Sequence, residues 1–317
     1  MATRQEQKRR AREQREARER QAARAEQRKR VRSYAAGGLL GAVVIAALVA
    51  VSLAGGDEGQ GAGGGGGGAA EAGHIHGLGI NPADGSLYIA THAGLFRAAR
   101  GSTEAPRVGT SDRDLMGFSV VGPDHFVASG HPGSESDLPG NIGLTESRDG
   151  GQTWEPVSLL GEADFHVLRA SGQRIYGYDG VNGRFMLSTD LGRNWMQREV
   201  PAVPFDLAID PKDPDHLIAA TDSGLRESRD AGRSWRNVSE QIALLAWGDE
   251  DTVFSLTLQG EVGVSRDGGK TARPTGTIQG QPVGFIAAKD GLYVALADGT
   301  VLKSTDDGAS FAVRARL

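Results

Sequence analysis

The chain of 317 residues contains no cysteine. It therefore forms no disulfide bond and carries no lipid on a cysteine, although this absence does not distinguish a reducing compartment from an oxidising one. The sequence also lacks a phosphate-binding glycine loop and the signature of a nucleophile triad. Residues 74–317 are short of positive charge, with 22 Lys and Arg against 32 Asp and Glu. Their excess of negative charge repels phosphate and excludes a nucleic-acid partner for this part of the chain.

The preceding residues differ sharply in composition. Residues 1–34 hold thirteen Lys or Arg and five Glu. Residues 35–54 form a run of twenty without a charged side chain, long enough to cross a bilayer as one helix. Residues 55–73 are rich in glycine and predict a flexible linker. The sequence thus predicts a basic tail, a transmembrane segment, a linker and a domain over residues 74–317.

A positive segment ahead of a single apolar span predicts a cytoplasmic N-terminus. We expect residues 35–54 to be an uncleaved signal anchor of the cell membrane, with residues 74–317 outside the cytoplasm. A cleaved signal peptide is the alternative, but the basic region is long for one and no small-x-small site directly follows Ala54. The tail is then either a solvated topology signal or a segment attracted to anionic lipid headgroups or nucleic acid.

One eight-residue motif recurs five times in the domain, at spacings between 37 and 41 residues. The copies are Ser147-Arg-Asp-Gly-Gly-Gln-Thr-Trp154, Ser188-Thr-Asp-Leu-Gly-Arg-Asn-Trp195, Ser228-Arg-Asp-Ala-Gly-Arg-Ser-Trp235, Ser265-Arg-Asp-Gly-Gly-Lys-Thr-Ala272 and Ser304-Thr-Asp-Asp-Gly-Ala-Ser-Phe311. A fixed period indicates one supersecondary unit repeated along the chain. The Ser and Asp side chains are suited to close a tight turn, and the final Trp is suited to pack between neighbouring units.

The period divides residues 74–317 into about six units. Each unit predicts four short strands, with the motif between the third and the fourth. The clearest unit predicts strands over Phe205–Asp210, His216–Asp222, Gly224–Ser228 and Ser234–Val238. The first unit lacks the motif, as terminal repeats often do. These units predict an all-β fold, a six-bladed β-propeller.

The pattern Ser-x-Asp-x-Gly-x-x-Trp resembles the Asp-box (BNR) repeat of sialidases, sortilin-type receptors, xyloglucanases and photosystem II assembly factors. The resemblance covers residues 74–317 and implies a β-propeller with Asp-box turns. The phrases that begin at His74 and Gly161 are similar to membrane-anchored bacterial propellers labelled glycosyl hydrolases or exo-sialidase-like. That second resemblance implies a glycosidase as the enzyme class to consider.

Strand direction predicts a polar rim around the central channel. In antiparallel blades, the starts of first strands and the ends of second strands meet at one end, and the motif turns lie at the other. Five of the seven histidines fall at this predicted rim, together with several aspartates. The residues are His74, His76, Asp164, His166 and Asp206 from first strands, and His92, His131, Asp179, Asp222 and Asp298 from second strands.

Imidazole and carboxylate groups together can bind a divalent transition metal. The candidate metal ligands are His74, His76, His92 and His166, and alternation along a strand would place the first two on one face. The alternative is that these groups are hydrated or paired with one another. Further candidates for binding a glycan or protein ligand are His131, Arg113, Arg184, Tyr178, Asp222 and Asp298. We expect the loop 130–140 at the same rim, where it is either a further binding element or a disordered surface excursion.

A glycosidase would need two carboxylates across the scissile bond. The candidate catalytic residues are Glu162, Asp164, Asp179 and Asp206. Sialidases also use an arginine cluster and an early Arg-Ile-Pro element, and the sequence contains no Arg-Ile-Pro. The sequence therefore predicts a membrane-anchored binding module that holds a ligand, metal or protein at its rim, with a sialidase-like glycoside hydrolase as the alternative.

Overall fold

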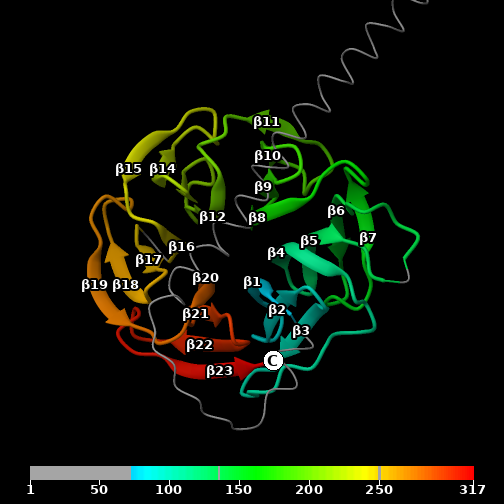
Figure 1. Cartoon of the computed structure of the whole chain (residues 1–317), viewed down its shortest axis with the longest axis horizontal. Coiled ribbons are helices and arrows are strands. Elements are labelled where there is room, and N and C mark those ends of the chain that lie inside the picture. The colour runs from blue at the N-terminus through cyan, green and yellow to red at the C-terminus, as the bar shows by residue number, and fades with distance from the viewer. Residues whose placement is uncertain (1–72, 135, 249–250) are drawn as a thin grey trace, which may run out of the picture. The chain divides into compact units, whose positions relative to one another are not determined.

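A computed structural model describes residues 73–317, except residues 135 and 249–250. The described residues form six antiparallel sheets arranged in a ring, as Figure 1 shows. The predicted six-bladed β-propeller is thus confirmed. The predicted tail, transmembrane segment and nearly all of the linker lie outside the described residues. Within the described part, no helix has the length and apolar character that crossing a bilayer requires.

Blades 1 to 3 contain the first eleven strands. Blade 1 has three strands: β1 (Ile75–Ile80), β2 (Leu87–Thr91) and β3 (Gly94–Ala98). Blade 2 has β4 (Asp114–Gly122), β5 (His125–His131), β6 (Leu144–Ser147) and β7 (Glu155–Ser158). Blade 3 has β8 (Phe165–Ser171), β9 (Arg174–Asp179), β10 (Arg184–Ser188) and β11 (Met196–Arg198).

Blades 4 to 6 repeat the four-stranded plan. Blade 4 has β12 (Pro204–Ile209), β13 (Leu217–Thr221), β14 (Gly224–Ser228) and β15 (Arg236–Ser239). Blade 5 has β16 (Ala243–Trp247), β17 (Val253–Thr257), β18 (Glu261–Ser265) and β19 (Arg273–Thr277). Blade 6 has β20 (Pro282–Ala288), β21 (Gly291–Leu296), β22 (Thr300–Ser304) and β23 (Ala312–Arg316).

The core lies between neighbouring blades. Every residue of β2, β13 and β17 is buried, because both faces of these strands pack against another sheet. The fourth strands lie at the periphery and are largely exposed. One apolar cluster joins Leu87 of blade 1 to Tyr293 and Val301 of blade 6. In addition, Arg316 in β23 donates its backbone N–H to Thr103 O at 2.9 Å. The first and last blades therefore close the ring.

The five motif turns share one set of hydrogen bonds. In the second copy, Ser188 Oγ donates to Asp190 Oδ1 at 2.8 Å and accepts the backbone N–H of Gly192 at 2.7 Å. Asp190 Oδ1 also accepts the N–H of Asn194 at 2.9 Å. Gly192 has a φ of +83°, a conformation that favours glycine. The same bonds recur in the other four copies. Each turn therefore stabilises itself within a few residues.

The tryptophans that end three of the turns pack against the preceding blade. Trp154 is 9% exposed and belongs to a cluster with Leu95 of blade 1. Trp195 stacks on Phe165 with ring centroids 4.7 Å apart and donates its indole N–H to Ser158 Oγ of blade 2. Trp235 is half-buried, and its indole N–H binds a carbonyl of blade 3. These indoles link adjacent blades, as the sequence predicts.

Candidate functional site

The inner strands of blades 1, 2 and 3 begin side by side around the central channel (Figure 1). The starts of these strands and the ends of the second strands of blades 1 and 2 bring together five histidines and two aspartates, which we call the histidine rim. Its members are His74, His76, His92, Asp114, His131, Asp164 and His166. The strand register explains why some of these residues are neighbours. Asp114, the first residue of β4, pairs with His131, the last residue of β5.

Three members of the rim form a compact group. His76 Nε2 lies 3.2 and 3.3 Å from the two ring nitrogens of His92. His92 Nδ1 lies 2.9 Å from Asp114 Oδ1, and His76 Nε2 lies 4.0 Å from the same oxygen. One ligand atom from each of the three side chains falls within 4.8 Å of the other two. Two nitrogens and one oxygen at this separation have the chemistry of a transition-metal site.

The environment of His76 keeps its ring neutral. Burial, followed by the charges of His92 and His74, lowers the pKa of His76 to about 3. A neutral imidazole retains a lone pair on one ring nitrogen, which is the form that binds a metal. His76 can therefore act as a ligand at neutral pH without first losing a proton.

Three further rim residues extend the compact group toward blade 3. His131 Nδ1 lies 3.4 Å from Asp114 Oδ2, and His131 Nε2 lies 3.5 Å from Asp164 Oδ2. His166 Nε2 forms a hydrogen bond of 2.9 Å with the same oxygen of Asp164. Burial opposes protonation of His166, but the hydrogen bond and charge of Asp164 outweigh it and raise the pKa of His166. Imidazoles and carboxylates thus alternate from blade 1 to blade 3.

Two buried oxygens of the rim have no hydrogen-bond partner among the described residues. They are Asp114 Oδ1 and Asp164 Oδ1. The short approach of His92 Nδ1 to Asp114 Oδ1 does not have the direction of a hydrogen bond. A buried carboxylate oxygen without a donor is costly. Both oxygens are therefore suited to a cation.

Asp114 is not among the site residues that the sequence predicts, although β4 begins at this residue. A usable signal exists: Asp114 precedes Gly117-Phe118 by the same offset at which His74 precedes Gly77-Leu78. Aligning the repeats on these glycines would have placed Asp114 at the rim.

A bulge at the start of the inner strands changes the expected direction of the side chains. The register shifts between Ile75 and Gly77 in blade 1, and at the corresponding place in blades 2, 3, 4 and 6. Bulges re-aim side chains, so simple alternation does not hold at His76. His74 is not part of the compact group; its ring centroid lies 5.4 Å from that of His92.

Two of the predicted catalytic aspartates are engaged in ion pairs. Asp179 binds Arg184, with Arg184 Nη2 2.7 Å and Nε 3.0 Å from Asp179 Oδ2. Asp206 binds Arg169 at 2.6 Å and accepts the backbone N–H groups of Leu207 and Leu245. Burial raises the pKa of Asp206, against the opposing charge of Arg169. Through these bonds Asp206 ties blade 4 to blades 3 and 5.

The other predicted site residues are spread over the rim and its turns. Glu162, Asp222 and Asp298 are exposed, and Asp298 accepts the N–H of Thr300 within its own turn. Tyr178 packs in the apolar cluster between blades 3 and 4, and burial, with the charges of Asp179 and Asp222, raises its pKa. Arg113 is half-buried beside Asp114, and burial lowers its pKa.

The two histidines outside the rim have structural partners. His125 Nε2 lies 3.0 Å from Glu146 Oε2. His216 is buried between two carboxylates, with Nδ1 3.1 Å from Asp210 and Nε2 2.9 Å from Glu227. These two histidines therefore lie outside the histidine rim.

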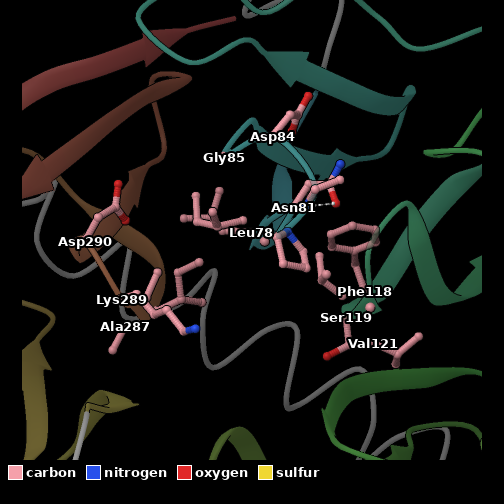
Figure 2. Close-up of a pocket in the computed structure, with 18 of the residues that line it drawn as sticks. Leu78, Asn81, Asp84, Gly85, Phe118, Ser119, Val121, Ala287, Lys289 and Asp290 are labelled. Carbon is pink, nitrogen blue, oxygen red and sulfur yellow. Dashed lines mark hydrogen bonds between the residues drawn. The ribbon is translucent and has the colours of Figure 1, made fainter.

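A cavity of about 710 Å³ lies at the opposite mouth of the channel, by the turns that follow the inner strands (Figure 2). Leu78, Phe118 and Val121 give it apolar walls. Two of its polar groups are already bound: Asn81 donates to Asp124 at 2.7 Å, and Asp290 accepts from Lys303 at 2.6 Å. The histidine rim, with its unpaired oxygens, is chemically better equipped to bind a ligand, and we take it as the candidate site.

Comparison with known proteins supports the fold and leaves the family open. No family model matches the chain. Sortilin from Rattus norvegicus is 30% identical over 77 residues, a stretch that covers 24% of this chain and 9% of sortilin. The chain thus spans less than a tenth of this curated relative.

Two solved structures resemble the propeller. The nidogen/laminin complex aligns with a TM-score of 0.52 and 11% identity, covering 69% of this chain and 88% of that one. The GH74 xyloglucanase from Xanthomonas campestris aligns with a TM-score of 0.49 and 16% identity, covering 77% of this chain and 45% of that one. At 11% identity, the likeness to the nidogen/laminin complex extends to the fold alone. The described part of the chain is a six-bladed β-propeller with a rim of histidines and aspartates.

Proposed function

We propose that residues 74–317 form a ligand-binding propeller that holds one divalent transition-metal ion between His76, His92 and Asp114. The observation that supports this best is the convergence of their ligand atoms within 4.8 Å of one another. A tetrahedral ion about 2.1 Å from each ligand would separate the ligand atoms by roughly 3.4 Å. With His92 Nδ1 as the ligand atom, the three distances bracket that value: 3.3 Å to His76 Nε2, 2.9 Å to Asp114 Oδ1, and 4.0 Å between His76 Nε2 and Asp114 Oδ1. Imidazole with carboxylate suits Cu²⁺ or Zn²⁺.

Each of the three residues has a defined part in this proposal. His76 supplies a neutral, largely buried nitrogen. His92 is more exposed, with 42% of its side chain accessible, and completes the pair from the end of β2. Asp114 supplies the negative charge that offsets the cation. Three protein ligands leave one position of a tetrahedral ion open, and this position would take water, a glycan hydroxyl or a group from a protein partner.

The same proposal includes a membrane anchor ahead of the propeller and the assignment of its motif turns. The charge step from residues 1–34 to the apolar run 35–54 supports an anchor in the cell membrane with the propeller outside the cytoplasm. The five turns with shared hydrogen bonds support assigning them to the Asp-box (BNR) repeat. The nidogen/laminin structure is a complex of two proteins, so a protein group is a reasonable occupant of the open position.

The metal content of the purified protein tests this proposal. Full-length protein without a histidine tag is purified, dialysed against Zn²⁺ or Cu²⁺ and measured by elemental analysis. We expect His76→Ala together with His92→Ala to remove the ion from the compact group. His125→Gln, a change at the opposite end of β5, should retain it. A wild-type protein that binds neither metal would overturn the proposal.

The glycoside hydrolase suggested by sequence remains the second candidate to be measured. It needs two carboxylates that face one substrate. Arg184 and Arg169 already bind Asp179 and Asp206, which leaves Asp164 and the exposed Glu162. Turnover of a chromogenic glycoside that disappears in Asp164→Asn, without any metal requirement, would favour the hydrolase over the metal-binding propeller.

A further inference from the structure

Three buried aspartates at the starts of inner strands or the ends of second strands differ in how their charge is balanced. Asp179 has Arg184 as its ion-pair partner, and Asp206 has Arg169 and two backbone N–H groups. Asp164 is equally buried, with 2% of its side chain exposed. Its neighbours are two imidazoles, His166 at 2.9 Å and His131 at 3.5 Å, both facing Oδ2. Its Oδ1 is buried and has no hydrogen-bond partner among the described residues.

We propose that Asp164, His131 and His166 form a second metal position, which makes the rim a site for two divalent ions. A buried carboxylate requires compensating positive charge. An ion bound by two imidazole nitrogens and the Asp164 carboxylate would supply that charge. Among the described residues, the ligand atoms that already lie within 4.8 Å of one another are those of His76, His92 and Asp114, so His131 and His166 must turn to reach a shared ion. The side chain of His131 is 43% exposed and that of His166 is 37% exposed. This exposure leaves them room to turn toward a shared ion.

The second position rests on the proposed function, because Asp114 belongs to both positions. Asp114 Oδ1 faces the first position, and Oδ2 lies 3.4 Å from His131 Nδ1. When His131 binds an ion through Nε2, its proton lies on Nδ1, directed toward Asp114. A histidine ligand commonly donates its other N–H to a carboxylate in this way. Asp114 is then a ligand for the first ion and a positioning residue for the second.

The competing arrangement is a carboxylate held by protonated histidines with no second ion. The two arrangements differ in stoichiometry. Full-length untagged protein is equilibrated with Zn²⁺ at neutral pH, and bound zinc is measured by elemental analysis. We expect two zinc ions for wild type and one for His131→Ala combined with His166→Ala. We also expect one for His76→Ala combined with His92→Ala, held at the second position.

Asp164→Asn provides a second variant that keeps the shape of the side chain, and it should also reduce the count to one. His125→Gln should keep two ions, and far-ultraviolet circular dichroism checks the fold of every variant. One zinc ion in wild type, unchanged in the His131 and His166 variant, would overturn the second position and leave the first intact. Loss of all zinc in that variant, with the fold retained, would mean a single site and would also overturn it. No zinc in wild type would remove the proposed function itself.

Discussion

Asp114 Oδ1 lies 2.9 Å from Nδ1 of His92, although the two residues belong to different blades. His92 follows β2 in blade 1, and Asp114 opens β4 in blade 2. The contact exists because β1 and β4 are neighbours around the channel. It joins two blades at the point where we place the first metal ion.

Replacing Asp114 with Asn should weaken metal binding at the first position. The substitution keeps the size of the side chain and removes the charge and one ligand oxygen. We expect a loss of affinity of at least roughly 10–100-fold, the range for changes that merely reorient a ligand. Isothermal titration with Zn²⁺ measures it. Asp112→Asn is the matched control, because Asp112 lies two residues away and binds Ser134. Equal affinities in the two variants would remove Asp114 from the ligand set.

Removal of the Trp154 side chain should destabilise the propeller by about 3–5 kcal/mol, the usual cost of truncating a buried aromatic residue. The indole is 9% exposed and packs in the cluster that includes Leu95. Trp235→Ala should cost less, because that indole is half-buried. Urea unfolding of the two variants measures both values. A smaller loss for Trp154 than for Trp235 would contradict the packing between blades 1 and 2.

The propeller should lose stability in acid because the aspartates of the motif turns become protonated. Hydrogen bonds from Asn194 and Ser188 lower the pKa of Asp190 from 3.8 to about 2, and those from Ser234 and Ser310 act alike on Asp230 and Asp306. The folded-state pKa lies below the unfolded value, so the contribution is complete above about pH 5 and is lost progressively as the pH falls through about 2.

Thermal unfolding measured between pH 5 and pH 2 checks this dependence. Asp190→Asn and Asp230→Asn together should reduce the stability at neutral pH and flatten the curve below pH 4. The control is Asp298→Asn, which alters an exposed turn outside the motifs. An unchanged slope in the double variant would show that the turns do not set the acid dependence.

Topology provides a fourth prediction. Protease added to intact cells should remove residues 74–317 and spare the basic tail, because the charge bias orients the apolar segment with its N-terminus inside. Immunoblotting with one antibody against the tail and one against the propeller measures it. A propeller that is cleaved only after the membrane is broken would place it in the cytoplasm and contradict the proposed anchor.

Local chemistry made the repeating architecture readable from the sequence. Ser188, Asp190 and Gly192 bond to one another within five residues, so the turn is encoded where it forms. The strands of blade 4 follow the predicted ranges to within about two residues, because alternation and turn residues are also local signals. Counting these units was enough to predict six blades.

The site depended on relationships that the sequence alone does not contain. Asp114 joins the rim because β4 starts there, three residues before Gly117, and a bulge follows between Leu115 and Gly117. Asp206 is a structural ion pair because Arg169, in the neighbouring blade, reaches it. Sequence reasoning predicted the end of the propeller at which the histidines gather. Only the packing of blade against blade decided which of them meet a carboxylate, because those contacts join residues far apart in the chain.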